Sequence, residues 1–242
     1  RLGRLHELLG DVEAAASLFA EVHGDETADS KVGLAAGVGR GRALTELGRY
    51  VEATKLLADV WGSAERAGAP AVALEAQVAL ADSLSQPGRK KSDWKDALEQ
   101  AEQTERGGQA LGLDDVVIQS GVIRVRTLTS LGDRKSAEEA LDALDTLFGR
   151  LAAQNSRLAV HAARVAHARC VYLQACGDKD GLVEAAKLGW SSVRHRWLDL
   201  RQSNFARPFV EGITVHRQLA EWGQVDLAEE GDVNLENSPP AP

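Results

Sequence analysis

Apolar residues recur at intervals of three and four positions along almost the whole chain. The segments LEAQVALADSL (74–84) and AEEALDALDTLF (137–148) have this spacing and are rich in Ala, Leu and Glu, which favour helices. No stretch alternates apolar and polar residues as a half-buried strand does. Pro70 and Pro87 fall between helical segments, where proline is tolerated. The pattern predicts an all-α fold.

The same helical pattern is repeated along the chain. LGDVEAAASLFAEV (9–22) and LGRYVEATKLLADV (47–60) are identical at six of fourteen positions, and LGDRKSAEEALDAL (131–144) is a third copy. Weaker copies are SDWKDALEQA (92–101) and CGDKDGLVEAAKLG (176–189). Each copy contains a helix end, a tight turn and a second helix, and the turns fall near Gly10, Gly48, Ser92, Gly132 and Gly177. Spacings of 38 to 45 residues between helix pairs are typical of an α-solenoid.

We therefore expect a right-handed α-solenoid of about five helix-turn-helix repeats over residues 1–198. Capping helices should follow over residues 199–223, and an acidic, proline-containing disordered tail or linker over residues 224–242. Ser136 with Glu139 has the spacing of a helix capping box, and Ser92 and Asp93 are candidate N-caps of the helix that follows Pro87.

These residues resemble the tetratricopeptide repeat. That motif has a small position, a turn position, an aromatic position and two positions in helix B. One copy fills them with Gly41, Gly48, Tyr50, Ala53 and Leu57, and another with Gly3, Gly10, Val12, Ala15 and Phe19. In the last copy, Cys170 and Gly177 fill the small and turn positions. The motif's Trp position instead holds Gly37, Gly121 or Ala166, and the repeats exceed about 34 residues. The longer repeats are similar to those of bacterial signal-transducing regulators. The resemblance implies a surface that binds proteins or peptides.

Composition narrows the class of protein further. Apolar residues make up 44% of the 242 residues and no apolar run reaches membrane-spanning length, so we expect no membrane partner. The chain shows no signal-peptide pattern and has two cysteines, which favours a cytoplasmic location. It begins within a helical pattern and lacks Met, so we expect a fragment of a longer protein.

The net charge of −8 is unevenly distributed. Residues 157–217 carry ten Lys and Arg against five Asp and Glu, whereas residues 218–242 carry six acidic residues and no basic one. The asymmetry indicates either a basic partner surface or an acidic tail that lies on a basic patch.

One column of side chains suggests a binding site. Arg4, Arg42 and Arg126 each lie six residues before a turn glycine, a place that faces the concave groove in tetratricopeptide arrays. Thr45 and Thr129 share that face, and in the last copy the groove-facing places hold Arg164 and His167. Arginine grips carboxylates and phosphates in bidentate fashion, so these seven residues predict a groove for an acidic or phosphorylated peptide. The alternative is that the arginines pair with groove carboxylates such as Glu75 and Asp82.

The sequence gives no indication of an enzyme, a cofactor or a metal. His161, His167, Cys170 and Cys176 would scatter around one helix rather than converge as zinc ligands do. GVGRG (37–41) lacks the spacing of a nucleotide-binding loop, and close helix packing explains its glycines. SDWK (92–95) lacks the companion motifs of a serine acylase.

The segment after the last repeat has an apolar stripe, Trp190, Val193, Trp197 and Leu200, flanked by Arg194, Arg196 and Arg201. We interpret the stripe as a cap on the solenoid core. The alternative is an aromatic and basic surface for nucleic acid within residues 157–217. The predicted function is a non-catalytic protein- or peptide-binding scaffold or sensor in a larger bacterial regulator. A third hypothesis is a repeat region in front of a protease or ATPase domain.

Overall fold

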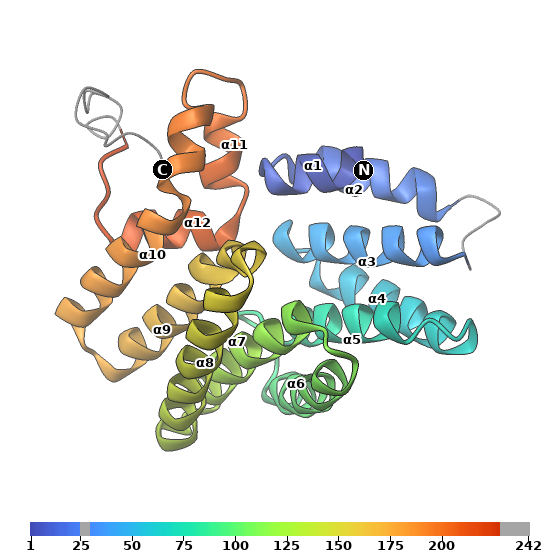
Figure 1. Ribbon diagram of the computed structural model, residues 1–242, viewed down its shortest axis with the longest axis horizontal. Coiled ribbons are helices and arrows are strands. Elements are labelled where there is room, and N and C mark those ends of the chain that lie inside the picture. Colours follow the sequence, from blue (N-terminus) through green and yellow to red (C-terminus); the bar gives the residue numbers. More distant parts are fainter. Residues whose placement is uncertain (25–29, 228–242) are drawn as a thin grey trace.

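The computed structural model describes residues 1–24 and 30–227, and these form α-helices and one 3-10 helix with no strand (Figure 1). The elements are α1 (Leu2–Leu8), α2 (Val12–His23), α3 (Lys31–Glu46), α4 (Tyr50–Arg66), α5 (Pro70–Leu84), α6 (Lys91–Leu111), α7 (Asp114–Leu131), α8 (Arg134–Gln154), η1 (Ser156–His161), α9 (Ala162–Cys176), α10 (Lys179–Leu200), α11 (Ala206–Glu211) and α12 (Thr214–Trp222). The predicted all-α fold is confirmed. Most of the predicted tail, residues 228–242, lies outside the described residues.

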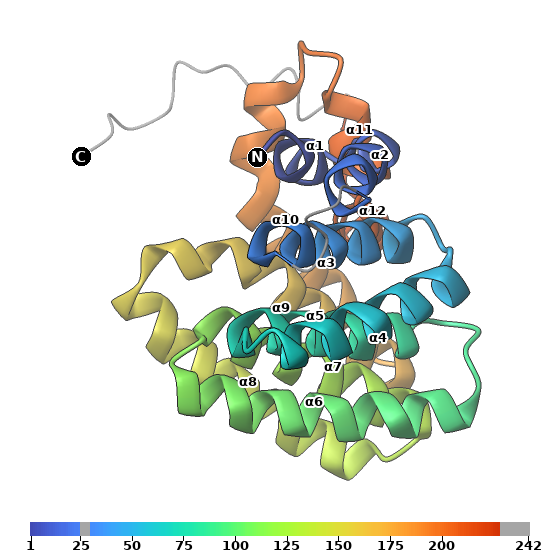
Figure 2. The same ribbon diagram turned by 90° about the vertical axis from the view of Figure 1, so that its right-hand side faces the viewer.

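The helices form a solenoid-like array of sequential pairs. We call α1, α3, α5, α7 and α9 the A helices, and α2, α4, α6, α8 and α10 the B helices. Each B helix packs between flanking A helices, and each A helix also contacts the next A helix along the chain. Helix α12 contacts α9 and α10 and so extends the layer of A helices. Figure 2 shows the first pairs stacked from α1–α2 downwards to α6.

The repeated turns depend on glycine. Gly10, Gly48, Gly132 and Gly177 have φ between 74° and 81°, the left-handed conformation that only glycine adopts without steric cost. At each turn the next residue donates its backbone N–H to a carbonyl five residues earlier, which satisfies the open end of the A helix. The left-handed backbone conformation of these glycines therefore fixes where the A helices end.

Aspartate, rather than serine, caps the helices after three of these turns. Asp11, Asp133 and Asp178 directly follow the glycines and accept hydrogen bonds from the N–H groups three residues later. The predicted capping box is wrong, because Ser136 lies inside α8 and is the residue whose N–H Asp133 accepts.

The third turn is also displaced from its predicted place. Gly88, with φ of 81°, makes the turn, and the helix N-cap is Lys90 rather than Ser92. Asp93 accepts a hydrogen bond from the backbone N–H of Lys90 and so helps to begin α6.

The glycines of GVGRG allow three helices to approach closely. A Cβ atom on Gly41 would lie 2.4 Å from Leu57 of α4, and one on Gly39 would lie 2.6 Å from Phe19 of α2. Gly37 similarly faces Val60 at 2.6 Å. Helix α3 thus packs against both neighbouring B helices through its backbone, as the packing interpretation of this motif expects.

The tryptophan stripe is part of the core. Trp190 and Trp197 are 2% and 6% exposed, and they form a cluster with Phe209 and Leu219 from α11 and α12. The centroids of the two indole rings, both on α10, lie 6.3 Å apart, and apolar side chains of α11 and α12 pack against them. These rings are not available to stack on the bases of a nucleic acid.

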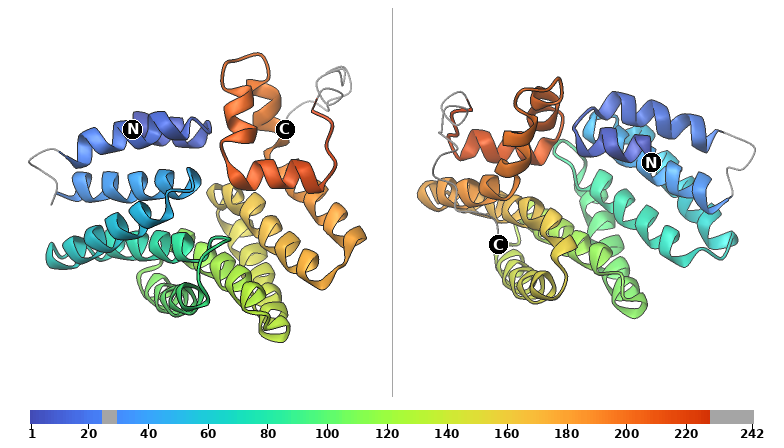
Figure 3. Two further views of the ribbon diagram at one scale, coloured as in Figure 1. Left: turned by 180° about the vertical axis from the view of Figure 1, so that it is seen from behind. Right: turned by 45° about the horizontal axis from the view of Figure 1, so that its top comes forward.

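The C-terminal helices also return to the first pair and contact it. A Cβ atom on Gly10 would lie 2.0 Å from the carbonyl oxygen of Pro208, and one on Gly212 would lie 2.0 Å from the carbonyl oxygen of Gly10. Glu46, at the end of α3, accepts a hydrogen bond of 3.1 Å from the N–H of Thr214, at the start of α12. Figures 1 and 3 show α11 beside the α1–α2 pair. The array therefore closes on itself instead of ending in an open groove.

No helix within the described ranges combines the length and the apolar character that crossing a membrane requires.

A comparison of Gly10→Ala with Gly48→Ala separates the effect of backbone strain at a turn from the effect of the contact that closes the array. Both residues have positive φ, but nothing lies within 4 Å of a Cβ atom on Gly48. We expect Gly48→Ala to lower the free energy of unfolding by about 1–2 kcal/mol through backbone strain. Gly10→Ala should cost about 1–3 kcal/mol more, because the backbone at Pro208 must move. Chemical denaturation measures the free energy of unfolding of both variants. Equal decreases would show that the contact between Gly10 and Pro208 adds no stability.

Trp197→Ala tests the aromatic cap. We expect the free energy of unfolding to fall by about 3–5 kcal/mol, as for other buried aromatic residues. An unchanged melting temperature by circular dichroism would contradict the packing of this ring in the core.

Candidate functional site

Closure of the array leaves two connected hollows on the side of the A helices. The inner cavity has a volume of about 130 Å³ and is lined by residues of all five helix pairs together with η1 and α12. The outer groove has a volume of about 1040 Å³ and runs between α1–α3 and the region of α5, α7 and η1. The residues that line both are Arg4, Glu7, Arg42, Gln119, Val160 and His161. The two hollows are therefore continuous.

Four arginines line the inner cavity: Arg4 from α1, Arg42 from α3, Arg164 from α9 and Arg196 from α10. Arg4 is bound to Glu7 at 2.7 Å on the exposed surface of α1. Among the described residues, Arg42, Arg164 and Arg196 have neither a hydrogen bond nor an ion pair. Three guanidinium groups thus face one small cavity without a bonded acceptor.

The carboxylates of the cavity wall are held by other donors. Glu7 accepts from Arg4, and Glu46 accepts from the backbone of Thr214. A carboxylate at the first turn of α12 also interacts favourably with the positive end of the helix dipole. These contacts fix the two acidic side chains in the wall of the cavity.

The third carboxylate of the cavity wall, that of Asp82, forms an ion pair with Arg126. Asp82 accepts from Arg126 Nη1 at 2.9 Å, and Arg126 Nη2 donates to Ser85 at 3.1 Å. Both side chains of the ion pair are largely buried, at 13% and 22% exposed. For Arg126 the structure therefore shows the alternative foreseen from the sequence, in which the arginine pairs with a carboxylate of the groove.

Arg42 is in an unfavourable electrostatic position. Burial lowers the pKa of its guanidinium, and the nearby charges of Arg4 and Arg164 lower it further, whereas Glu7 and Glu75 oppose the shift. Glu75 acts on Arg42 at a distance, without an ion pair between them in the described structure. Folding thus disfavours the charge on Arg42.

Arg164 adds positive charge to the centre of the array. Its charge contributes to lowering the pKa of His161, His167 and His216, although burial is the largest cause for each ring. The pKa of His167 and that of His216 fall to about 4, so both rings are neutral at pH 7.

The remaining predicted site residues are bound within the protein. The hydroxyls of Thr45 and Thr129 donate to carbonyls of their own helices, and both side chains are buried. His167 contacts Gln218 through Nε2 and stacks on Trp222, with ring centroids 5.3 Å apart. Of the seven predicted residues, the structure brings Arg4, Arg42 and Arg164 together at the inner cavity.

His161 lies in the wall of both hollows and is 7% exposed. Its Nε2 contacts Asp115 Oδ1 at 2.7 Å, while its Nδ1 is buried without a partner among the described residues. Burial lowers the pKa of the ring and Asp115 opposes that shift. The site therefore contains one more polar atom with unused hydrogen-bonding capacity.

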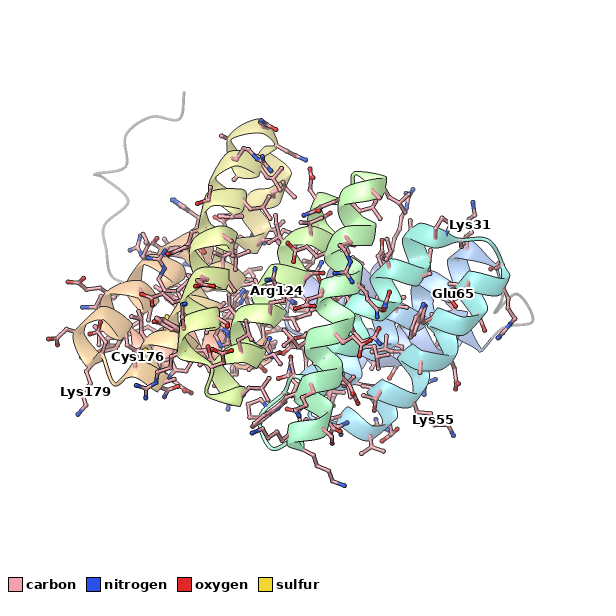
Figure 4. The ribbon with its side chains drawn as sticks, turned by 90° about the horizontal axis from the view of Figure 1, so that it is seen from below. Lys31, Lys55, Glu65, Arg124, Cys176 and Lys179 are labelled. Carbon is pink, nitrogen blue, oxygen red and sulfur yellow. The ribbon has the colours of Figure 1, made fainter. Side chains whose placement is uncertain are left out.

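The four His and Cys considered as metal ligands do not converge. Cys170 is buried, and burial raises the pKa of its thiol to about 11, whereas Cys176 is exposed near Lys179 at one end of the molecule (Figure 4). His161 and His167 have the separate partners described above. Within the described residues, no three His, Cys, Asp or Glu side chains are grouped to hold a metal.

Arg196 is the cavity residue that the repeat pattern did not indicate. It lies on α10, a B helix, whereas repeat alignment assigns groove-facing places to A helices. Its position at the cavity follows from closure of the array, because α12 and the first pair complete the wall opposite it. The sequence feature that pointed to Arg196 was its position in the basic segment, residues 157–217.

No model of a known protein family matches the chain, and no curated protein matches its sequence. Functional inference therefore rests on the residues of the two hollows.

Arg42→Met and Arg126→Met test which of the two arginines stabilises the folded protein. Met keeps an apolar stem of similar length but removes the charge. We expect Arg42→Met to leave the melting temperature unchanged or to raise it, because folding lowers the pKa of Arg42. Arg126→Met should lower the free energy of unfolding by about 1–3 kcal/mol, since it removes the charged partner of Asp82. Thermal unfolding would contradict this assignment if Arg42→Met were the more destabilising change.

Proposed function

We propose that this protein is a non-catalytic module that binds peptide segments of partner proteins in the outer groove. The peptide inserts an anionic group into the inner cavity. The observation that supports this proposal most strongly is the continuity of a large groove with a small cavity that contains three uncommitted arginines.

The walls of the outer groove fit the apolar part of such a peptide. Leu2, Val22, Val32 and Val160 line it and are 41% to 69% exposed. Its volume of about 1040 Å³ lies slightly above the range of about 300–1,000 Å³ for small-molecule pockets. Exposed apolar side chains at the rim of a groove commonly mark a binding surface.

The distribution of charge supports the proposal that the anionic part of the peptide enters the inner cavity. The outer groove is balanced, with Arg1, Arg4, Lys31 and Arg42 against Glu7, Glu21, Glu75 and Asp115. In the inner cavity, Arg42, Arg164 and Arg196 remain without an acceptor, because the three carboxylates Glu7, Glu46 and Asp82 are bound by Arg4, by the backbone of Thr214 and by Arg126. Arginine forms strong, charge-assisted hydrogen bonds with anionic oxygens in such a partly dry site.

The role of sensor or scaffold in a larger bacterial regulator is part of the proposal and rests on the tetratricopeptide resemblance. The nucleic-acid alternative is not supported by the tryptophan stripe, because Trp190 and Trp197 are buried.

Two synthetic peptide libraries test the proposal. Both have apolar residues around one central position, which is Asp in one library and Asn in the other. We expect fluorescence anisotropy to show at least tenfold tighter binding of the Asp library, because a hydrogen bond to a charged group contributes about 1.5–3 kcal/mol. Binding should weaken as salt is added.

Arg42→Ala should abolish the preference for Asp, and Arg66→Ala is the matched control. Arg66 is exposed on α4, bonds only to Ser63 among the described residues, and lines neither hollow. Absence of binding by both libraries, or an equal preference for Asp in the wild type and Arg42→Ala, would overturn the proposal.

A further inference from the structure

The inner cavity has unused hydrogen-bonding capacity on several sides. The guanidinium groups of Arg42, Arg164 and Arg196 come from three different helices and have no bonded partner among the described residues. Nδ1 of His161, in the same wall, is buried without a partner. When Nε2–H of His161 donates to Asp115, Nδ1 of the neutral ring is an acceptor, so the unused donors of the cavity are the three guanidiniums. Three cationic donor groups without an acceptor at one cavity favour an anionic ligand.

The size of the cavity restricts that ligand to a compact group. A protein cavity of about 150 Å³ accommodates a benzene molecule, which has six heavy atoms. The inner cavity, at about 130 Å³, therefore suits a group of similar size, such as a carboxylate or a phosphate. A nucleotide or a whole helix does not fit within it.

The number of arginines, and the different helices that carry them, favour a phosphate over a carboxylate. One planar guanidinium satisfies a carboxylate with two parallel hydrogen bonds. Three guanidiniums from α3, α9 and α10 match a tetrahedral group whose oxygens point in several directions. A phosphomonoester also carries a charge of about −1.5 to −2 at pH 7, which offsets the repulsion between neighbouring arginines better than a single negative charge.

We propose that the inner cavity is a phosphate-binding site, in which Arg42, Arg164 and Arg196 hold the oxygens of a phosphorylated side chain. This inference rests on the proposed function, because the peptide in the outer groove carries the phosphorylated residue. Free phosphate presents the same chemistry, and the experiment separates the two sources.

The surrounding contacts keep the arginines available to this ligand. Glu46 is held by the N–H of Thr214, and Asp82 is held by Arg126. Both of these carboxylates are thus fixed by contacts that join two helices. Glu46 acts in this way as a positioning residue.

Inorganic phosphate is the first probe. Isothermal titration calorimetry should show saturable binding of phosphate by the wild type and binding at least tenfold weaker for acetate. Arg42→Gln and Arg164→Gln should each weaken phosphate binding at least tenfold, while Arg66→Gln leaves it unchanged. Arg164→Lys should recover only part of the affinity, because Lys lacks the planar fork. Circular dichroism of each variant verifies that the fold is intact.

The second probe is a peptide library with phosphoserine at the central position, compared with its Asp and Ser counterparts. We expect phosphoserine to bind at least tenfold more tightly than Asp, and phosphate to compete with it. Failure of phosphate to bind, or equal binding by wild type and both Gln variants, overturns the phosphate site even if Asp peptides still bind. Binding of phosphate without any gain from phosphoserine overturns the peptide source instead and identifies free phosphate as the ligand.

Discussion

The contact between the backbone of Gly10 and that of residues 208–212 shapes the side of the molecule on which the candidate site lies. Without this contact the five helix pairs would form a curved array with an open concave face. With it, the last helices cover that face and leave a small cavity beside a larger groove. A side chain at Gly10 would prevent the contact, because a Cβ atom there meets main-chain atoms that cannot rotate away.

Local features of the structure followed from the sequence, and contacts between distant segments did not. The turn glycines and the period of the repeats predicted the helix pairs, because a left-handed turn is specified by one residue and its neighbours. Closure joins residues about 200 positions apart through backbone atoms, so no hydrophobic or charged pattern announces it. The misplaced cap at Ser136 has a simpler cause, since Asp133 offered an equally good acceptor closer to the turn.

The candidate site was predictable in part for the same reason. Repeat alignment correctly identified equivalent backbone positions for Arg4, Arg42 and Arg126, but the environment of a side chain depends on its neighbours. Arg126 meets Asp82, Arg4 meets Glu7 on the exposed surface, and Arg42 meets other arginines. Equivalent positions of this repeat array therefore lie in different environments, because each repeat faces a different opposite wall.

The electrostatics of the cavity also explain how such a site persists in a stable fold. Neighbouring like charges oppose folding, and burial lowers the pKa of Arg42. The repulsion is offset elsewhere, by aromatic packing around Trp190 and Trp197 and by the ion pair between Arg126 and Asp82. An anionic ligand would remove part of the repulsion and bind the folded state alone, so its binding would stabilise the closed array. The proposed anion site would therefore link the stability of the closed array to the affinity for the anion through Arg42, Arg164 and Arg196.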